Sequence, residues 1–424
     1  MTQKWIDIAD LALGMFVVKL GGSYVDHPFW RSRFLLAKEE DLRLLQVSGV
    51  NRICIDTAQG RDVGTHARPA PPPDVAADAP TTATRSDAEM GAAVGPAIIG
   101  KRGDRGSAFV PIKQEMRRAA RICSKSKEAV SAMFQEARLG KAVDAERMQP
   151  LVEEISDSVS RNPGALISLA RLKTKDDYTY LHSVAVCALM TALARQFGFD
   201  DEATRKAGMG GLVHDVGKAL VSDAILNKPG KLTDDEFVSI KLHPELGHKL
   251  LAEGAGATPE MLDVCLHHHE KIDGTGYPEK LVDAQISQLA KMGAVCDVYD
   301  AITSNRPYKS GWDPSDSLRR MAEWKGHFDP RIFQTFVKSL GIYPIGSLVG
   351  LESGRLGVVI EQHSRSLLVP KVLVFFSTKS RSHIAVEEVD LSLPQCQDRI
   401  VGRESAAKWG LVHLDSLWAN FQNS

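Results

Sequence analysis

The sequence lacks the features that mark membrane, secreted and disulfide-bonded proteins. No apolar run approaches the roughly 18 residues that cross a bilayer. The N-terminus carries Asp7 where a signal peptide needs apolar residues. The six cysteines form no C-x-x-C pair, so they are expected to be reduced core thiols. We therefore expect a cytoplasmic protein without a membrane span.

The sequence also has no large excess of charge of either sign. The net charge is −1 over 424 residues. A general nucleic-acid binder usually carries a basic stripe, so general nucleic-acid binding is not expected. An anionic substrate must instead be held by a few placed cations or by metal. The length exceeds one core of ordinary size, so two or three folded units are expected.

The first part of the chain has the pattern of a small folded unit followed by a linker. Residues 1–56 combine alternating apolar positions with a short helical pattern over 38–45 and a strand-like run over 51–56. They predict a small N-terminal α/β domain. Residues 57–110 are rich in Pro, Ala and Gly without apolar periodicity, which predicts a disordered linker.

The rest of the chain divides into a helical part and a β-rich part. Residues 111–342 repeat apolar positions at helical spacing, with a core over 170–340. Residues 343–424 show short β-rich runs around turns, at 347–351, 357–361, 372–376 and 384–389. The helical spacing is clearest in three segments: 113–136, 144–160 and 176–197. Thr233 and Glu236 form a capping box that predicts another helix start, and Pro259 suits the first position of the next helix. The predicted fold class is mainly α, with a small C-terminal β appendage.

Histidine is concentrated in the helical part. Seven of the 13 histidines fall between His182 and His269. A lone histidine on an apolar helix face is usually a hydrogen-bonded core residue, and a lone buried aspartate is usually a cap or half of an ion pair. The interpretation changes because five imidazoles and two carboxylates share one domain: His182, His214, Asp215, His243, His268, His269 and Asp297.

This donor set predicts a metal centre. Imidazole and carboxylate together suit Fe, Mn, Zn, Co or Ni, and the lack of thiolate clusters argues against a structural zinc site. Seven donors are too many for one ion, but they suit two ions bridged by a carboxylate, for which we choose Asp215. Two divalent ions are therefore expected, with Fe or Mn favoured.

Three further elements suit phosphate chemistry. Lys218 follows Asp215 by three residues, so its ammonium could meet a phosphoryl oxygen. Arg306 and Lys309 follow the predicted helix of Asp297 and could supply two more cations. The glycines of the loop 273–278 permit positive φ and close backbone approach to a ligand. Taken singly, these would be a surface lysine, a solvated helix end and a turn.

The ordered motifs resemble those of a known family. His214-Asp215, with His182 upstream and Asp297 downstream, is similar to the pattern of the HD phosphohydrolase superfamily. The segment 268–278 resembles the signature that names the HD-GYP family. Further matching motifs lie at 243–247, 297–301 and 306–309, so the resemblance spans roughly 170–340. Residues 1–56 resemble the small domain of unknown function that often precedes HD-GYP domains, which implies no activity but leaves room for signalling-protein partners.

The resemblance implies metal-dependent hydrolysis of the bacterial second messenger cyclic di-GMP. A water between two metals would attack phosphorus, and the product would be pGpG and, after a second cut, GMP. The implied ligands of one ion are His182, His214, Asp215 and Asp297, and those of the other are Asp215, His243, His268 and His269. The implied substrate contacts are Lys218, Tyr277, Arg306 and Lys309, with Asp215 and Lys218 catalytic.

The resemblance also sets expectations for neighbouring residues. Some relatives carry a Glu before the first histidine that brings in a third metal; here that position is Tyr178, so two metals are expected. Asp300 and Glu270 are candidates to orient ligand imidazoles. His267 lies off the stripe of His268 and is interpreted as solvated, and His248 is likewise set aside.

Two other functions fit parts of the same pattern. One is an HD hydrolase of another nucleotide, against which the 273–278 loop and the pair Arg306 and Lys309 argue. The other is a non-catalytic cyclic di-GMP receptor or signalling scaffold. Degenerate family members typically lose ligands, whereas all seven are present here, so phosphodiesterase is the predicted function.

Overall fold

The computed structural model describes most of the chain in two compact units. The described residues are 3–20, 34–37, 39, 42, 52–62, 110–172, 178–228, 230–304, 311–363, 366–411, 414 and 417. The units comprise Met1–Asp104 and Arg105–Ser424. Most of the linker expected over 57–110, and most of the helix expected over 38–45, lie outside the described residues. Within the described ranges, no helix has both the length and the apolar character that a membrane crossing requires.

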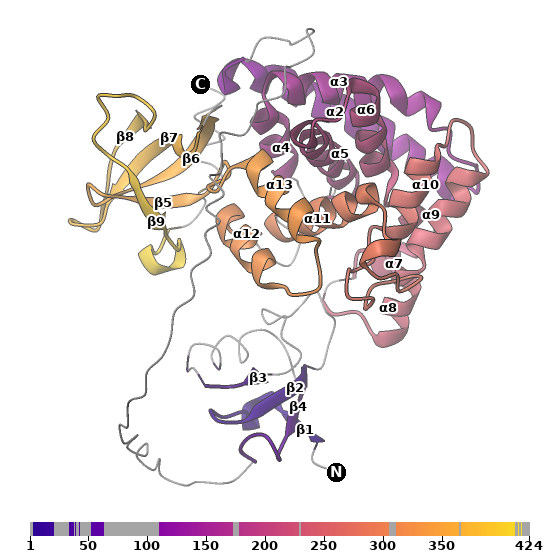
Figure 1. Cartoon of the computed structure of the whole chain (residues 1–424), viewed down its shortest axis with the longest axis horizontal. Helices are drawn as coiled ribbons and strands as arrows, with labels where there is room; N and C mark the ends of the chain where they lie inside the picture. The colour runs from indigo at the N-terminus through magenta and orange to yellow at the C-terminus, as the bar shows by residue number, and fades with distance from the viewer. Residues whose placement is uncertain are drawn as a thin grey trace, which may run out of the picture. The chain divides into compact units, whose positions relative to one another are not determined.

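The N-terminal unit contains a four-stranded antiparallel sheet (Figure 1). Its strands are β1 (Gln3–Asp7), β2 (Phe16–Leu20), β3 (Phe34–Leu35) and β4 (Arg52–Asp56), in the order β1-β4-β2-β3. Ile6, Val17, Ile53 and Ile55 fill its small core. The strand expected over 51–56 is confirmed as β4.

The second unit is mostly helical, and α5 (Tyr178–Phe197) runs through its middle (Figure 1). It contacts α2, α3, α4, α6, α11 and α13. Every residue from Val184 to Ala194 is buried, because this helix is apolar on all sides. The other helices are α2 (Ile112–Arg138), α3 (Gln149–Arg161), α4 (Pro163–Arg171), α6 (Asp201–Val213), α7 (Asp223–Leu226), α8 (Asp234–Lys241), α9 (His243–Ala252), α10 (Pro259–His267), α11 (Gln288–Thr303), α12 (Pro314–Glu323) and α13 (Pro330–Leu340).

Side-chain caps begin several of these helices where the sequence predicts. Thr233 accepts from the backbone N–H of Glu236, and the Glu236 carboxylate accepts from the N–H of Thr233, so the capping box of α8 is confirmed. Thr258 caps α10, and Pro259 is its first residue. The segment expected to be helical over 144–160 begins with a 3-10 turn, and its α-helix starts later, at Gln149.

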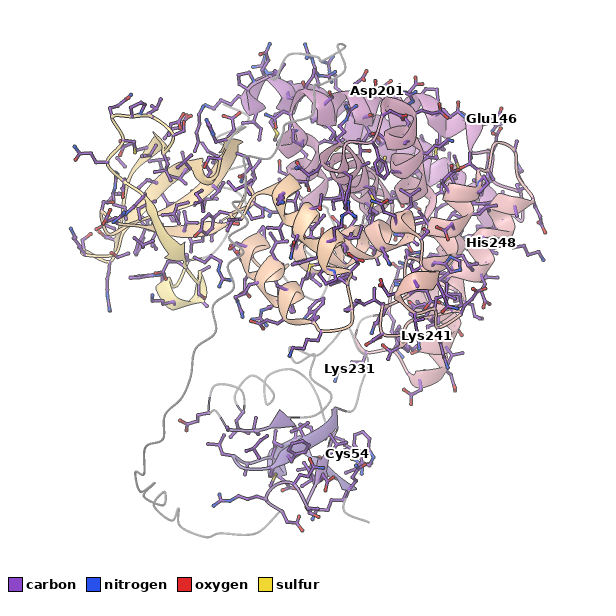
Figure 2. The ribbon with its side chains drawn as sticks, viewed as in Figure 1. Cys54, Glu146, Asp201, Lys231, Lys241 and His248 are labelled. Atoms are coloured by element: carbon purple, nitrogen blue, oxygen red, sulfur yellow. The ribbon has the colours of Figure 1, made fainter. Side chains whose placement is uncertain are left out.

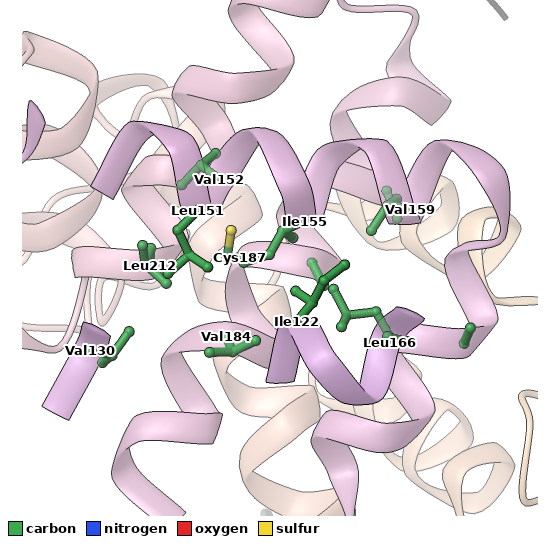
Figure 3. Close-up of a cluster of buried hydrophobic side chains, with 14 of the residues drawn as sticks. Ile122, Val130, Leu151, Val152, Ile155, Val159, Leu166, Val184, Cys187 and Leu212 are labelled. Carbon is green, nitrogen blue, oxygen red and sulfur yellow. The ribbon is translucent and has the colours of Figure 1, made fainter. Parts of the chain in front are cut away.

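The main core lies between α2, α3, α5 and α6 (Figure 3). Ile122, Ile155, Val184, Cys187 and Leu212 are among its buried side chains. Each buried aliphatic side chain of this size contributes about 1.5–3 kcal/mol by leaving water. This core holds α5 and α6 firmly side by side, and both helices carry predicted metal ligands.

The C-terminal part of the second unit is a five-stranded antiparallel sheet. Its strands are β5 (Leu348–Leu351), β6 (Arg355–His363), β7 (Ser366–Ser377), β8 (Ser382–Asp390) and β9 (Ile400–Arg403), in the order β8-β7-β6-β5-β9. Leu356 and Phe375 join the same core cluster as Ile112 and Leu166 of the helices. The predicted mainly α fold with a small β appendage is therefore confirmed; β9 was not expected.

Candidate metal centre and active site

The seven predicted ligands come from five helices and meet at one point. His182 lies in the second turn of α5, His214 ends α6, and His243 begins α9. His268 and His269 follow α10, and Asp297 lies within α11. Asp215 precedes the 3-10 turn Val216–Leu220. Residues more than a hundred positions apart in the sequence thus form one cluster.

Asp215 is at the centre of the cluster. Its Oδ2 lies 3.4 Å from His182 Nε2 and 3.3 Å from His214 Nε2. Its Oδ1 lies 3.2 Å from His243 Nε2 and 3.7 Å from His268 Nε2. Each carboxylate oxygen therefore faces a different pair of imidazoles, which is the arrangement that a carboxylate shared by two cations requires.

Asp297 lies close to His182 on one side and to His269 on the other. Its Oδ1 is 3.0 Å from His182 Nε2, and its Oδ2 is 3.8 Å from His269 Nδ1. Donor atoms within 4.8 Å of one another form two sets that share Asp215: one with His182 and His214, and one with His243, His268 and His269. These sets match the two expected ligand groups except for Asp297, which is in neither set and lies near a histidine of each.

Hydrogen bonds on the far side of the rings aim the histidines at this centre. Nδ1 of His214 lies 2.8 Å from the carbonyl oxygen of Gly211, and Nδ1 of His243 lies 2.7 Å from that of Ile240. The Nδ1 of His268 is likewise bonded to carbonyls of its own helix. Because Nδ1 must carry the proton in these bonds, the Nε2 lone pair is left for a cation.

Asp300 orients the ring of His182 through a similar bond to Nδ1. Its Oδ2 lies 2.6 Å from His182 Nδ1, and its side chain is buried one turn after Asp297 on α11. Carboxylate partners of this kind orient a ligand ring and increase its basicity. Asp300 therefore lies where an orienting residue is needed.

The residues present fit divalent cations. Six of the seven donors are buried, and His269 keeps 21% of its side chain exposed. Among the described residues, the buried atoms His214 Nε2 and Asp215 Oδ1 have no hydrogen-bond partner. Buried polar atoms without partners are costly, and cations held by this cluster would satisfy both.

The charge states of the metal-free cluster follow from burial and from the two carboxylates. Burial alone would lower the pKa of His182, but its bonds to Asp215, Asp297 and Asp300 raise that pKa to about 10. Burial lowers the pKa of His268 to about 3, with the nearby His214 and His243 acting in the same direction. The pKa of the Asp215 carboxyl is well below its usual range, because His214 and Lys218 outweigh its burial.

Metal uptake is therefore expected to strengthen as pH rises. With a pKa of about 10, His182 is protonated at neutral pH and must lose that proton to bind a cation. Affinity for Mn²⁺ should rise by up to about tenfold per pH unit between pH 6.5 and 8.5, with proton release in calorimetry. Asp300→Asn removes a carboxylate partner of His182 and should shift this rise toward lower pH. Equal affinity of the unmodified protein at pH 6.5 and 8.5 would contradict the assignment of His182 as a ligand.

Two of the four predicted substrate residues, Lys218 and Tyr277, border the cluster and are partly exposed. Lys218 Nζ lies 2.5 Å from Asp215 Oδ2 and keeps 23% of its side chain exposed. The Tyr277 ring stacks on the ring of His269, at 4.7 Å between centroids and an angle of 28°. Arg306 and Lys309 lie outside the described residues. The side chain of Tyr178 also lies outside them, so the expected count of two ions stays a prediction.

Glu270 does not take the position expected of it. Its carboxylate accepts from the backbone N–H groups of Glu279, Lys280 and Leu281, at 2.7–3.0 Å, and not from a ligand imidazole. Three consecutive amides offer a buried carboxylate better compensation than one ring nitrogen does. Glu270 therefore secures the chain just after Tyr277, and it supports the ring that stacks on His269.

The loop 273–278 uses its two glycines in different ways. Gly274 has a φ of +75°, as expected of a turn glycine. A Cβ on Gly276 would lie 2.5 Å from the Cα of Glu270, so this glycine allows close approach to the chain itself. The expectation that both serve ligand approach is corrected for Gly276.

The two histidines that were set aside are not among the clustered donors. His267 Nδ1 bonds to Asp263 at 2.8 Å, and its Nε2 lies 3.3 Å from Glu279. Its side chain is only 15% exposed, so it is ion-paired and half-buried, and the interpretation as solvated is corrected. His248 lies on α9 and carries one of the labels in Figure 2.

Glycines that were not singled out from the sequence let the ligand-bearing helices pack closely against one another. A Cβ on Gly211 of α6 would lie 3.0 Å from the carbonyl oxygen of Val186 on α5. A Cβ on Gly210 would lie 3.1 Å from the side chain of Val264 on α10. Glycine inside a helix costs about 1 kcal/mol relative to alanine, so the run Gly208-Met-Gly-Gly211 was an available signal of close helix packing.

The clustered residues lie within a stretch that matches a known family. Residues 154–332 match the family model described as HD domain, and residues 3–148 match a domain of unknown function (DUF3391), a range that takes in α2. A cyclic di-GMP phosphodiesterase of Pseudomonas aeruginosa is 52% identical over 99% of this chain and 97% of its own length. A cyclic di-GMP phosphodiesterase response regulator of Xanthomonas campestris pv. campestris is 35% identical over 45% of this chain and 51% of its own length.

A third relative acts on a different cyclic dinucleotide. The 3′3′-cGAMP-specific phosphodiesterase 1 of Vibrio cholerae is 30% identical over 41% of this chain and 41% of its own length. The near-complete match to the Pseudomonas protein covers both units, and the HD and GYP motifs both lie within the clustered region. This chain therefore belongs to the HD-GYP family of HD-domain proteins.

Proposed function

We propose that this chain is a metal-dependent phosphodiesterase that hydrolyses cyclic di-GMP. The observation that carries the proposal is the Asp215 carboxylate, whose two oxygens each face a separate pair of imidazoles. The 52% identity to a cyclic di-GMP phosphodiesterase along nearly the whole chain supports the choice of substrate. The end product is pGpG, or GMP where pGpG is cut again.

The cluster would hold two divalent ions. His182, His214, Asp215 and Asp297 would bind one, and Asp215, His243, His268 and His269 the other. Fe or Mn is favoured, because this set of nitrogen and oxygen donors contains no thiolate. Bound ions supply Lewis acidity, which lowers the pKa of a water nucleophile and neutralises charge on the phosphoryl oxygens.

The remaining residues position the substrate and balance charge. The Lys218 ammonium, already beside Asp215, stabilises negative charge on a non-bridging phosphoryl oxygen as the ribose 3′ oxygen leaves. Tyr277, which stacks on His269, would line the substrate pocket. Asp300 keeps the His182 ring aimed inward while these charges develop. Arg306 and Lys309 are proposed as further phosphate contacts.

The N-terminal unit would serve signalling partners and not the chemistry. It lies within the match to a domain of unknown function, which covers residues 3–148 and extends into the second unit, and the predicted ligands all lie beyond that match. We propose boundaries at 1–56 for this domain, 57–110 for the linker, 111–342 for the catalytic domain and 343–424 for the β appendage.

Turnover by protein purified without chelator tests the proposed function. After incubation with Fe²⁺ or Mn²⁺ and cyclic di-GMP, chromatography is expected to show pGpG or GMP. Parallel reactions contain 3′3′-cGAMP, because one relative is specific for that nucleotide. Preferred cleavage of 3′3′-cGAMP would reassign the substrate, and cyclic di-GMP bound but intact would indicate a receptor.

A further inference from the structure

A lysine that the sequence analysis did not single out lies beside the metal centre. Lys241 is the last residue of α8, two positions before His243, and it is labelled in Figure 2. Its Nζ is 4.7 Å from the ring centroid of Phe237, one turn earlier on the same helix, and 5.2 Å from that of Tyr277. Tyr277 stacks in turn on His269. The ammonium group therefore lies one aromatic ring away from a predicted metal ligand.

Among the residues that the structure describes, this ammonium group has aromatic neighbours but no anionic one. Lys241 is half-buried, and it makes no ion pair with any residue that the structure describes. Contacts with two ring faces stabilise this cation and also restrict its position. The charge of Lys241 also acts on Lys271. Burial lowers the pKa of Lys271, Asp273 raises it, and the positive charge of Lys241 lowers it further. Two positive charges thus share this side of the cluster.

The helix that carries Lys241 is not part of the buried core. All residues of α7 and α8 are described, and none of them is buried. A capping box and the ion pair of Lys228 with Glu236 hold this segment locally. Lys241 is therefore held by its two ring contacts at the edge of the core, where its ammonium group can still reach an anion.

We propose that Lys241 binds the phosphate of the cyclic dinucleotide that is not being hydrolysed. This proposal rests on the proposed function. Lys241 and His269 both contact the Tyr277 ring, and Lys241 is not among the clustered donors, so we assign its ammonium group to a phosphate other than the one held by the metal ligands. A cyclic dinucleotide carries a second phosphate on the opposite side of its ring. With one phosphate beside Asp215, the second would lie outside the cluster, beyond Tyr277. There it would be next to the ammonium group of Lys241.

The test compares three substitutions at one position on two substrates. Lys241→Met is expected to raise KM for cyclic di-GMP by about 10- to 100-fold, the size of one lost charge-assisted hydrogen bond, with kcat changed less than threefold. Lys241→Arg should restore KM to within a few-fold, and Lys241→Gln should be as impaired as Lys241→Met. On bis(p-nitrophenyl) phosphate, which has one phosphate, all three variants should match the unmodified enzyme.

Lys249→Met is the matched control. Lys249 lies on α9, keeps 74% of its side chain exposed and is 3.9 Å from Glu253. Its KM should be unchanged, and metal content and thermal unfolding should be equal in all variants. An unchanged KM for Lys241→Met, or full function of Lys241→Gln, would overturn the proposal. If the unmodified enzyme cleaves bis(p-nitrophenyl) phosphate but no cyclic dinucleotide, the proposed function fails, and the role of Lys241 fails with it.

Discussion

Asp215→Asn is expected to lower kcat for cyclic di-GMP by at least about 10³-fold and to reduce the bound metal. The substitution keeps the volume of the side chain but replaces one oxygen by an amide NH₂ group, which cannot coordinate a cation. Because the two oxygens of Asp215 face separate imidazole pairs, the change affects both ion positions. Removal of one preorganised electrostatic contact costs on the order of 10²–10³ in kcat, and here two ions lose their shared ligand.

Steady-state turnover and metal analysis of the purified variant check this expectation. Glu115→Gln is the matched control, because Glu115 is also fully buried and bonded to a cation, Arg161, at 2.8 Å, but lies outside the cluster. This control should lose stability while keeping its metal content and its kcat. Near-normal hydrolysis by Asp215→Asn with metal supplied would mean that Asp215 is not the shared ligand.

The helical domain and its donor set were predictable because both depend on local patterns. His182 lies on an apolar stripe of α5, and the stripe alone indicates that its side chain faces the interior. The capping box at Thr233 marks a helix start within three residues. Helical periodicity over tens of residues outweighs single exceptions, so the mainly α class followed directly from the sequence.

The details that aim the donors depend on contacts between distant segments. Glu270 and Asp300 are both acids near predicted ligands, and only the folded chain shows that one binds loop amides and the other an imidazole. The pairing of Lys241 with Tyr277 likewise joins α8 to a loop 36 residues later. Strand β9 has four residues, one of them Gly402, which is too short for a period of two to stand out.

Gly217→Ala is expected to disrupt the site by pushing the turn after Asp215 away from α9, which carries His243. Gly217 lies two residues after Asp215, and a Cβ there would lie 2.0 Å from the carbonyl oxygen of His243 and 2.4 Å from the amide nitrogen of Gly247. Both atoms belong to the backbone of α9, so the helix itself must move. A displacement of about 1 Å at reacting groups costs on the order of 10²-fold in rate, and overpacking typically costs about 1–3 kcal/mol of stability.

We therefore expect Gly217→Ala to lose at least about 10²-fold in kcat/KM, together with about 1–3 kcal/mol in the free energy of unfolding. Urea denaturation and steady-state kinetics measure the two effects. Gly402→Ala is the control, because a Cβ on Gly402 meets nothing within 4 Å. If Gly217→Ala behaves like Gly402→Ala, close contact between the Asp215 turn and α9 is not what holds His243 against the shared carboxylate. If only Gly217→Ala loses activity and stability, the two ligand groups can meet at Asp215 only because residue 217 has no Cβ.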